Sequence, residues 1–350
     1  MVPALAVADA LRAEGARVTF IGTRERSEAE LVPAAGYEID FLAVSGLDRR
    51  NPLKATLAAM RAVRAVGAAR KILSRRGADA VMGGGGYVAG PAGLAASRMG
   101  LPLVLTEADS HLGLANRLLA KRARRVCLAF PIPGREGEPY LVTGRPVPEA
   151  VIDADRGAAR RRFAIPAEAP CLLVFGGSLG ARTINDAALA AFGGEAERPF
   201  HVLHISGTRD YEDLRQRLEQ EGGGGYTLVG YEHSLGDALA ASDLVLARSG
   251  GSIFEIAAAG KPAILVPYPH ATADHQTTNA RWMTSAGAAE LIVDGELTPQ
   301  LLEQRCGELL ADSQRLARMA DASRKLAMPD AAQRIAAEVL AAAREPRGHE

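Results

Sequence analysis

The chain has 350 residues, a length that favours two domains, and its 48% hydrophobic and 23% charged residues are ordinary for a globular protein. Its 5% aromatic content shows no pattern for stacking on bases, which disfavours a nucleic-acid partner, and no apolar run approaches the ~20 residues of a membrane-spanning helix. Residues 1–148 hold 21 Lys and Arg against 13 Asp and Glu, or +8, and the remainder holds 20 against 28, or −8. The first half is therefore expected to meet an anionic partner, and any membrane contact is expected to be peripheral.

In chain order, a helix comes first and short apolar runs then alternate with longer helical patterns. The opening stretch, "VPALAVADALRAEG", predicts an amphipathic helix with Pro3 in its first turn. The apolar runs are "RVTFIGT", "ADAVMGGGG", "LPLVLTEAD", "CLLVFGGSLG", "HVLHISG", "DLVLARSGG" and "PAILVPYPH". Such continuous runs are typical of parallel strands buried between helices, and glycine or polar residues gather where each run ends. The sequence predicts an α/β fold of two doubly wound domains, with ligands at the carboxyl ends of the strands.

The domain boundary is expected near "TGRPVPEAV", residues 143–151, where two prolines stiffen the connection. This gives a first domain of residues 1–148 and a second of residues 149–325. Residues 326–350 are expected to form a long helix that packs back on the first domain.

The cysteines and histidines carry no metal-like spacing. Cys127, Cys171 and Cys306 are expected to be buried thiols in a reducing compartment. His270 and His275 lack a nearby cysteine or paired carboxylate, so we expect no metal site and no cofactor.

Two glycine-containing loops in the second domain each follow an apolar run and open a helix. In the first, Ser249–Ser252 forms a small-residue turn and Glu255 falls in the first helical turn. Free N–H groups there favour a diphosphate, and the carboxylate can accept hydrogen bonds from ribose hydroxyls. The alternative is a helix start with a stabilising acid. The second loop, "FGGSLGAR", matches neither the dinucleotide fingerprint nor a P-loop. Together the two loops indicate a nucleotide diphosphate, and Gln276 in "ADHQTTNA" is placed to bind its sugar.

The first domain offers a glycine turn, an acidic strand end and a basic stretch. The turn "GGGGYVAGP" allows close approach of a ligand to the backbone. The strand end "TEADSHLGLANR" groups Glu107, Asp109, His111 and Asn116, with a solvated turn as the alternative. Residues 51–76 place basic side chains beside an apolar stripe, which suits an anionic membrane surface or, alternatively, a core helix weakened at Gly67.

Taken together and in this order, these pieces resemble the MurG family of bacterial UDP-N-acetylglucosamine transferases, glycosyltransferase family 28. The pieces are "PALAVADALRAEG", "IGTRERSEAELVPAAGYEIDFLAVSGL", "GGGGYVAGPAGLAA", "GLANRLLA", "FGGSLGARTIND", "RSGGSIFEIAAAGKPAILVPYPHATADHQTTNA" and "PDAAQRIAAEVL". The resemblance implies a GT-B fold and inverting transfer from UDP-N-acetylglucosamine to the lipid-linked acceptor undecaprenyl-pyrophosphoryl-MurNAc-pentapeptide. It places the enzyme at the cytoplasmic face of the cell membrane, as a peripheral protein.

The resemblance also implies a set of site residues. The implied donor-binding residues are Ser178, Tyr231, Glu232, Arg248, Ser249, Gly250, Gly251, Ser252, Ile253, Phe254, Glu255, His275 and Gln276. The implied acceptor-binding residues are Gly85, Gly86, Tyr87, Asp109 and Asn116.

The start of the chain departs from the family pattern. The family begins with a strand and a G-G-T-G-G-H turn whose histidine is a candidate general base, whereas this sequence opens on the helix that follows. We therefore expect the natural protein to be longer at its amino terminus. Within the sequence as it stands, Glu107 and Asp109 are the carboxylate candidates for catalysis. The alternatives are another GT-B UDP-sugar enzyme, including a UDP-GlcNAc 2-epimerase, and a non-catalytic UDP-sugar-binding protein.

Overall fold

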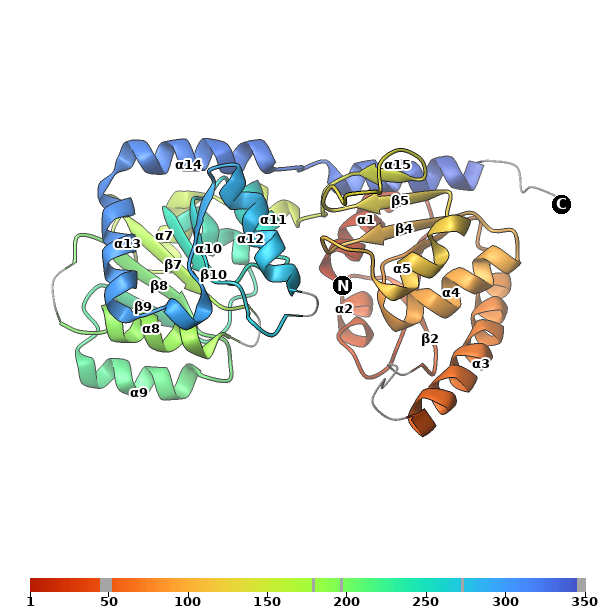
Figure 1. Cartoon of the computed structure of the whole chain (residues 1–350), viewed down its shortest axis with the longest axis horizontal. Helices are drawn as coiled ribbons and strands as arrows, with labels where there is room; N and C mark the ends of the chain where they lie inside the picture. Colours follow the sequence, from red (N-terminus) through yellow and green to blue (C-terminus); the bar gives the residue numbers. More distant parts are fainter. Residues whose placement is uncertain (45–51, 178–179, 196–197, 272–273, 345–350) are drawn as a thin grey trace. The chain divides into compact units, whose positions relative to one another are not determined.

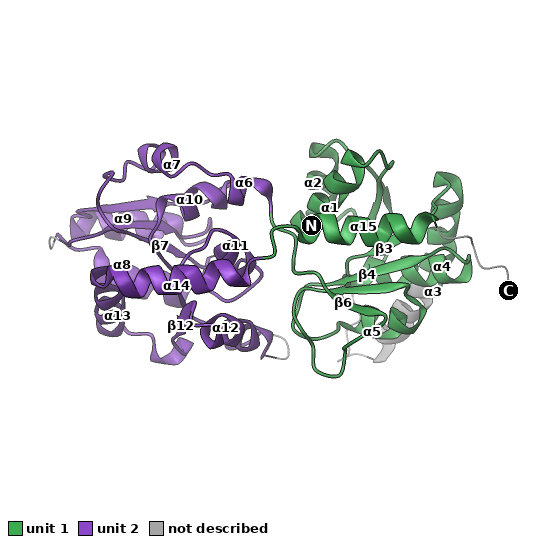
Figure 2. Ribbon diagram, turned by 90° about the horizontal axis from the view of Figure 1, so that it is seen from above, with its two compact units in different colours: residues 1–147, 328–350 green, residues 148–327 purple. Residues whose placement is uncertain are grey.

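The chain divides into two compact units in this computed structural model (Figure 1). The structure describes residues 1–44, 52–177, 180–195, 198–271 and 274–344, with only the backbone for residues 52–62. Unit 1 contains Met1–Val147 and Met328–Glu350, and unit 2 contains Pro148–Ala327 (Figure 2).

Unit 1 is built on two parallel sheets. β1 and β2 form a two-stranded sheet, and a four-stranded sheet has the order β3-β4-β5-β6. The strands are β1 (Thr19–Gly22), β2 (Glu38–Phe41), β3 (Val81–Gly83), β4 (Leu103–Glu107), β5 (Arg125–Leu128) and β6 (Tyr140–Val142).

The helices of unit 1 include both its first and its last element. They are α1 (Val2–Ala13), α2 (Glu28–Ala34), α3 (Pro52–Arg76), α4 (Gly86–Arg98), α5 (Leu114–Leu119), the 3-10 helix η1 (Ala120–Arg122) and α15 (Ala331–Arg344). Gly67 does not interrupt α3, which is a single helix of 25 residues. The apolar residues Ile335, Ala336 and Val339 recur at helical spacing, so one face of α15 packs with Val7 and Leu11 of α1.

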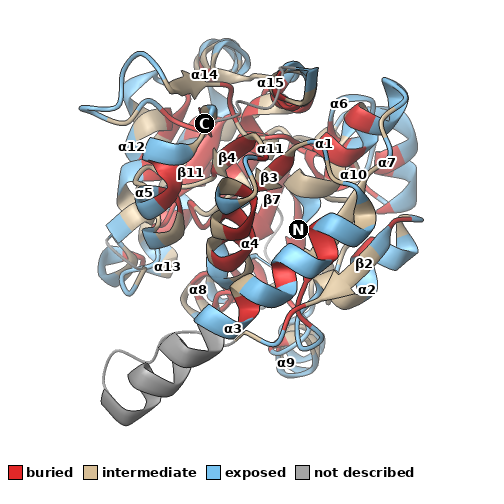
Figure 3. Ribbon diagram, turned by 90° about the vertical axis from the view of Figure 1, so that its right-hand side faces the viewer, coloured by how far each residue is buried: buried red, intermediate tan, exposed pale blue. Residues whose placement is uncertain are grey.

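Unit 2 is a doubly wound parallel sheet with the order β12-β11-β10-β7-β8-β9. Its strands are β7 (Cys171–Phe175), β8 (His201–Ile205), β9 (Tyr226–Val229), β10 (Leu244–Ala247), β11 (Ala263–Leu265) and β12 (Ala289–Leu291). Every residue of β7, β8, β10 and β11 is buried, as their largely apolar runs predict. Figure 3 shows this buried interior in red.

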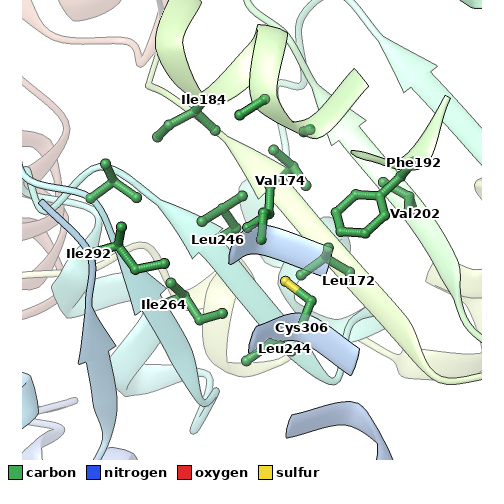
Figure 4. Close-up of a cluster of buried hydrophobic side chains, with 14 of the residues drawn as sticks. Leu172, Val174, Ile184, Phe192, Val202, Leu244, Leu246, Ile264, Ile292 and Cys306 are labelled. Carbon is green, nitrogen blue, oxygen red and sulfur yellow. The ribbon is translucent and has the colours of Figure 1, made fainter. Parts of the chain in front are cut away.

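Helices cover both faces of the unit 2 sheet. They are α6 (Glu149–Ile152), α7 (Arg156–Arg162), α8 (Arg182–Phe192), α9 (Tyr211–Glu221), α10 (Leu235–Ala241), α11 (Ile253–Ala258), α12 (His275–Ser285), the 3-10 helix η3 (Asp294–Glu296), α13 (Pro299–Ala311) and α14 (Ser313–Leu326). On one face, Leu172 and Leu246 of the central strands pack with Ile184 and Phe192 of α8 and Cys306 of α13 (Figure 4). Because this core holds the strands in place, it also positions the loops that follow them.

Several simple expectations are confirmed. The α/β architecture with parallel sheets is present, and Cys127, Cys171 and Cys306 are buried free thiols. Burial raises the pKa of Cys127 and of Cys171 to about 12, and it also raises the pKa of Cys306. Among the described helices, none combines the length and the apolar character needed to traverse a bilayer.

Candidate functional site

Two loops of unit 2 leave the sheet side by side at its topological switch point. The chain runs outward from β7 to β9 and then returns to β10 on the other side of β7. Phe175 at the end of β7 pairs with Ala247 at the end of β10, so the loops that follow begin at the same level. Open α/β sheets bind ligands in the crevice outside this point. This edge of the sheet is the candidate site of unit 2.

The loop after β10 presents peptide N–H groups just ahead of α11. Within the described part of the chain, the N–H groups of Gly250, Gly251 and Ser252 have no hydrogen-bond partner. The N–H groups of Ile253 and Phe254 close turns on the carbonyls of Gly250 and Gly251, both at 3.3 Å. Unpaired N–H groups on a turn that precedes a helix can accommodate an anionic ligand.

Glu255 and Arg248 flank this loop in different ways. Glu255 is partly buried in the first turn of α11. Arg248 is only 8% exposed, and its guanidinium donates to the carbonyls of Val266 at 3.1 Å and Pro267 at 3.2 Å. The same group contacts the carboxylate of Asp294. The Arg248 side chain thus bonds the loop after β10 to the loop after β11 and contacts Asp294 of η3.

Gln276 and His275 open helix α12, which follows β11. The side-chain oxygen of Gln276 accepts a hydrogen bond from the backbone N–H of Tyr268 at 3.0 Å. A Cβ built on Gly250 would lie 3.8 Å from the amide nitrogen of Gln276. The amide N–H groups of Gln276 therefore lie beside the glycine turn, where they can donate to a ligand oxygen. His275 is partly buried at the first position of α12.

The loop after β9 is held by the carboxylate of Glu232. Its two oxygens accept from Arg162 at 2.9 and 2.7 Å, and one also accepts from the N–H of Ser234 at 2.7 Å. The hydrogen bond with Glu232 is the main cause that raises the pKa of Arg162. Because the Glu232 side chain is 3% exposed, its backbone is the part left to contact a ligand. The Tyr231 ring is 45% exposed and packs edge-on against His233, with ring centroids 4.8 Å apart.

The loop after β7 requires glycine for close backbone packing. Ser178, predicted to hold the diphosphate, lies outside the described residues. Gly180 has φ +77°, and a Cβ there would lie 2.1 Å from the carbonyl oxygen of Ser206. No other residue fits this position without moving the backbone.

A buried polar chain, which sequence reasoning missed, lies behind this loop. Asn185 donates to the Ser206 carbonyl at 2.9 Å and to Asp210 at 3.0 Å, so its oxygen must accept from Nε2 of His204 at 3.1 Å. Nδ1 of His204 then accepts from the hydroxyl of Tyr226 at 2.6 Å. Complete burial lowers the pKa of His204 to about 3, which keeps the ring neutral. The only sequence signal was a polar residue at an inward position of the run "HVLHIS".

In unit 1, the carboxylate of Glu107 organises the loop after β4. One oxygen accepts from the N–H of Gly113 at 2.8 Å and from Asn116 at 2.9 Å, and the other accepts from the N–H of Asp109 at 3.3 Å. Glu107 is 8% exposed and Asn116 is 1% exposed, whereas Asp109 is less buried. The amide of Asn116 also donates to the Thr106 carbonyl at 2.9 Å, while its oxygen has no hydrogen-bond partner among the described residues. Through these three hydrogen bonds, the carboxylate of Glu107 holds the loop after β4 in its conformation.

The glycine turn after β3 lies beside Asn116. Gly85 and Gly86 have φ of +80° and +75°, and a Cβ on Gly85 would lie 3.9 Å from the amide nitrogen of Asn116. The structure therefore brings the two predicted acceptor segments together. The Tyr87 ring is 50% exposed, and the guanidinium of Arg26 stacks over it at 5.2 Å. Arg26 was missed, although the charged loop "TRERSE" after an apolar run was its signal.

The predicted residues that the structure describes thus gather in two groups, one at the carboxyl ends of the strands of each unit. Among the described residues, no three His, Cys, Asp or Glu side chains come close enough to hold a metal ion. The chemistry that the arrangement offers in unit 2 is hydrogen bonding to an anion and to hydroxyl groups.

Comparison with known proteins gives the same result for both halves of the chain. Residues 1–128 match the family model described as Glycosyltransferase family 28 N-terminal domain, and residues 171–335 match that of the Glycosyltransferase family 28 C-terminal domain. The crystal structure of MurG from Acinetobacter baumannii is similar with a TM-score of 0.77 and 29% identity, over 97% of this chain and 95% of that one. The calicheamicin glycosyltransferase CalG4, at 21% identity and a TM-score of 0.66, shares the fold. The predicted GT-B class is confirmed.

Sequence relatives cover nearly the whole chain. The UDP-N-acetylglucosamine–N-acetylmuramyl-(pentapeptide) pyrophosphoryl-undecaprenol N-acetylglucosamine transferase of Moorella thermoacetica is 40% identical over 332 residues, which are 91% of this chain and 89% of that protein. The protein of the same name from Salinibacter ruber is 41% identical over 350 residues, covering 97% of this chain and 93% of that protein. With both halves matched and relatives of this similarity along its length, the chain belongs to glycosyltransferase family 28.

Proposed function

We propose that this protein transfers N-acetylglucosamine from UDP-N-acetylglucosamine to the 4-hydroxyl of lipid-linked N-acetylmuramyl-pentapeptide, in peptidoglycan synthesis. The acceptor oxygen bonds to the anomeric carbon as the bond from that carbon to the UDP oxygen breaks. The electron pair leaves with UDP, the hydroxyl proton goes to a base, and the configuration inverts. The relatives named above carry this activity in their names.

The observation that carries the proposal is the pair of loops at the switch point of unit 2. The N–H groups of Gly250–Ser252 are available to bind the diphosphate. The neighbouring loop, which follows β7, leads into the amino terminus of α8, a helix of eleven residues. Such fixed donors stabilise the negative charge that builds on the departing UDP. Glu255 accepts the ribose hydroxyls, and the amide of Gln276 donates to the N-acetylglucosamine. The backbone at Tyr231 and Glu232 contacts the uracil.

The acceptor binds at the glycine turn and at the loop after β4 in unit 1. Of the two carboxylates proposed for catalysis, Asp109 is the more accessible to the acceptor, because Glu107 is buried and already accepts three hydrogen bonds. Glu107 instead keeps the loop in shape. Tyr87 and Arg26 add a partly exposed ring and a cation beside the turn.

The proposal is tested first by binding and then by turnover. Calorimetry on the whole chain should detect UDP and UDP-N-acetylglucosamine, and mass spectrometry should detect one added N-acetylhexosamine on a short-chain analogue of the lipid-linked acceptor. Absence of binding for both nucleotides would overturn the proposal.

The same experiment separates the alternatives. A 2-epimerase would change the sugar nucleotide itself, which proton NMR of the donor detects without any acceptor. A different transferase would modify soluble acceptors and leave the lipid-linked one unchanged. Binding without turnover on any acceptor would favour a non-catalytic UDP-sugar-binding protein.

We also propose that unit 1 rests on the anionic cytoplasmic face of the membrane. Leu118 is 63% exposed on α5 and Val63 is 72% exposed on α3. Arg117, Lys121 and Arg122 lie beside Leu118 in the sequence, and residues 1–148 carry a net +8. Exposed apolar side chains surrounded by basic ones favour an anionic lipid surface. Leu118→Glu should weaken sedimentation with phosphatidylglycerol vesicles several-fold, and equal sedimentation of the variant and the unsubstituted chain would refute this placement.

A further inference from the structure

The loop that follows β10 and the start of helix α12 are tied together by a reciprocal pair of buried hydrogen bonds. The hydroxyl of Ser249, which is fully buried, donates to the backbone carbonyl of Gln276 at 2.8 Å. In return, the side-chain amide of Asn279, which is 2% exposed, donates to the backbone carbonyl of Ser249 at 3.0 Å. The loop after β10 and the start of α12 thus hold each other, each through a side chain and a carbonyl.

This tie joins segments that are distant along the chain but begin at the same level of the sheet. Ala247 at the end of β10 pairs with Leu265 at the end of β11, so both loops leave the sheet together. Ser249 and Gln276 are nevertheless 27 residues apart in the sequence. The distance between the glycine turn and the start of α12 is therefore set by these side-chain bonds as well as by the backbone.

Arg248 provides a second tie at the base of the same two loops. Its bonds to the carbonyls of Val266 and Pro267 and its contact with Asp294 hold the first residues after β11 against the first residue after β10. Arg248 thus fixes the part of the two loops that lies next to the strand ends. The part where Gln276 lies beside Gly250 is fixed by Ser249 and Asn279.

We infer that Ser249 and Asn279 are positioning residues that set the sugar-reading amide of Gln276 at a fixed distance from the diphosphate turn. UDP contacts the glycine turn and Glu255, whereas the sugar contacts Gln276. Loosening the tie should therefore reduce recognition of the sugar while leaving recognition of UDP largely intact. This inference rests on the proposed function, because it concerns how the same donor site distinguishes its sugar.

The test compares the affinities for UDP and for UDP-N-acetylglucosamine in variants of the whole chain. Ser249→Ala removes the hydroxyl donor, and Asn279→Ala removes the amide donor from the other side. In each variant, calorimetry should show UDP-N-acetylglucosamine binding weakened about tenfold and UDP binding changed less than about twofold, in line with the loss of one buried hydrogen bond. Ser249→Thr keeps a hydroxyl and should restore most of the ratio.

A matched control is available at the amino ends of the strands of the same sheet. Ser242 is also fully buried, and its hydroxyl donates to the carbonyl of Leu239 at 2.9 Å just before β10 begins. Ser242→Ala removes a comparable bond and should leave the ratio of the two affinities unchanged. A parallel loss of both ligands in Ser249→Ala and Asn279→Ala, or an unchanged ratio, would overturn the inference. If the unsubstituted chain binds neither ligand, the proposed function fails instead.

Discussion

The buried His204 should make the stability of unit 2 depend on pH. Burial lowers the pKa of His204 from 6.5 to about 3 in the folded chain. The unfolded chain therefore binds a proton below pH 6.5 that the folded chain excludes, so stability is full above that pH and falls as the solution is acidified. Each pH unit below 6.5 costs about 1.4 kcal/mol. At pH 5 the loss amounts to about 2 kcal/mol, which is measurable against a domain stability of 5–15 kcal/mol.

The assay is urea unfolding followed by the fluorescence of Trp282. The sequence contains one tryptophan, and it lies in unit 2 on α12 against Phe254, so the signal reports this unit. His204→Gln removes the titrating ring. We expect this variant to be less stable at pH 7.5 but to lose about 2 kcal/mol less than the unsubstituted chain between pH 7.5 and pH 5. His233→Gln, a substitution at an exposed position, serves as the control.

The result that would refute this reasoning is an equal loss of stability in His204→Gln and the unsubstituted chain. Burial also lowers the pKa of His201, so the unsubstituted chain should lose more than the share of His204 alone. The difference between the two proteins, not the total loss, is therefore the quantity to measure. An equal loss would mean that His204 is protonated in the folded chain or is hydrated.

Three further predictions concern the two sites and the thiols. Glu255→Ala should raise the donor KM about 10- to 100-fold, because two hydrogen bonds to a charged group are lost; an unchanged donor KM would discard its ribose role. Glu107→Ala should raise the acceptor KM severalfold while the UDP dissociation constant stays the same, because the N–H of Gly113 loses its partner; a change confined to the UDP constant would contradict this. Cys127 and Cys171, whose pKa values are raised to about 12, should react with iodoacetamide at pH 8 only after unfolding, and rapid labelling of the folded chain would show that they are accessible.

The loops of the candidate site in unit 2 could be predicted to lie together because the signal was local. Each lies where an unbroken apolar run meets glycine and serine, and parallel strands bring such ends to one edge. The strands β7 and β10 gave this signal. By contrast, β2 and β6 are four and three residues long with mostly half-buried side chains; charged residues interrupt β2, and β6 is too short for its apolar residues to stand out.

The bonds that hold the loops could not be predicted. Ser249 and Asn279 meet across 30 residues, and an isolated Ser or Asn has no periodic pattern that marks it as buried. The family resemblance implied that Arg248 contacts the donor. The structure shows that its guanidinium is engaged with two carbonyls and Asp294, since a buried cation needs partners that sequence proximity does not reveal. The sequence therefore indicated which strand ends come together, but not the side-chain bonds that hold the loops beyond them.

The division of the chain has a consequence for synthesis on the ribosome. Unit 1 is made of Met1–Val147 and Met328–Glu350, with unit 2 inserted between them. Val7 and Leu11 of α1 share their apolar cluster with α15, which is translated last. The nascent chain therefore completes unit 2 while a hydrophobic surface of unit 1 is still uncovered. The apolar face of α1 is covered only once α15 has been synthesised, so the first unit to begin translation acquires its full core after unit 2 is complete.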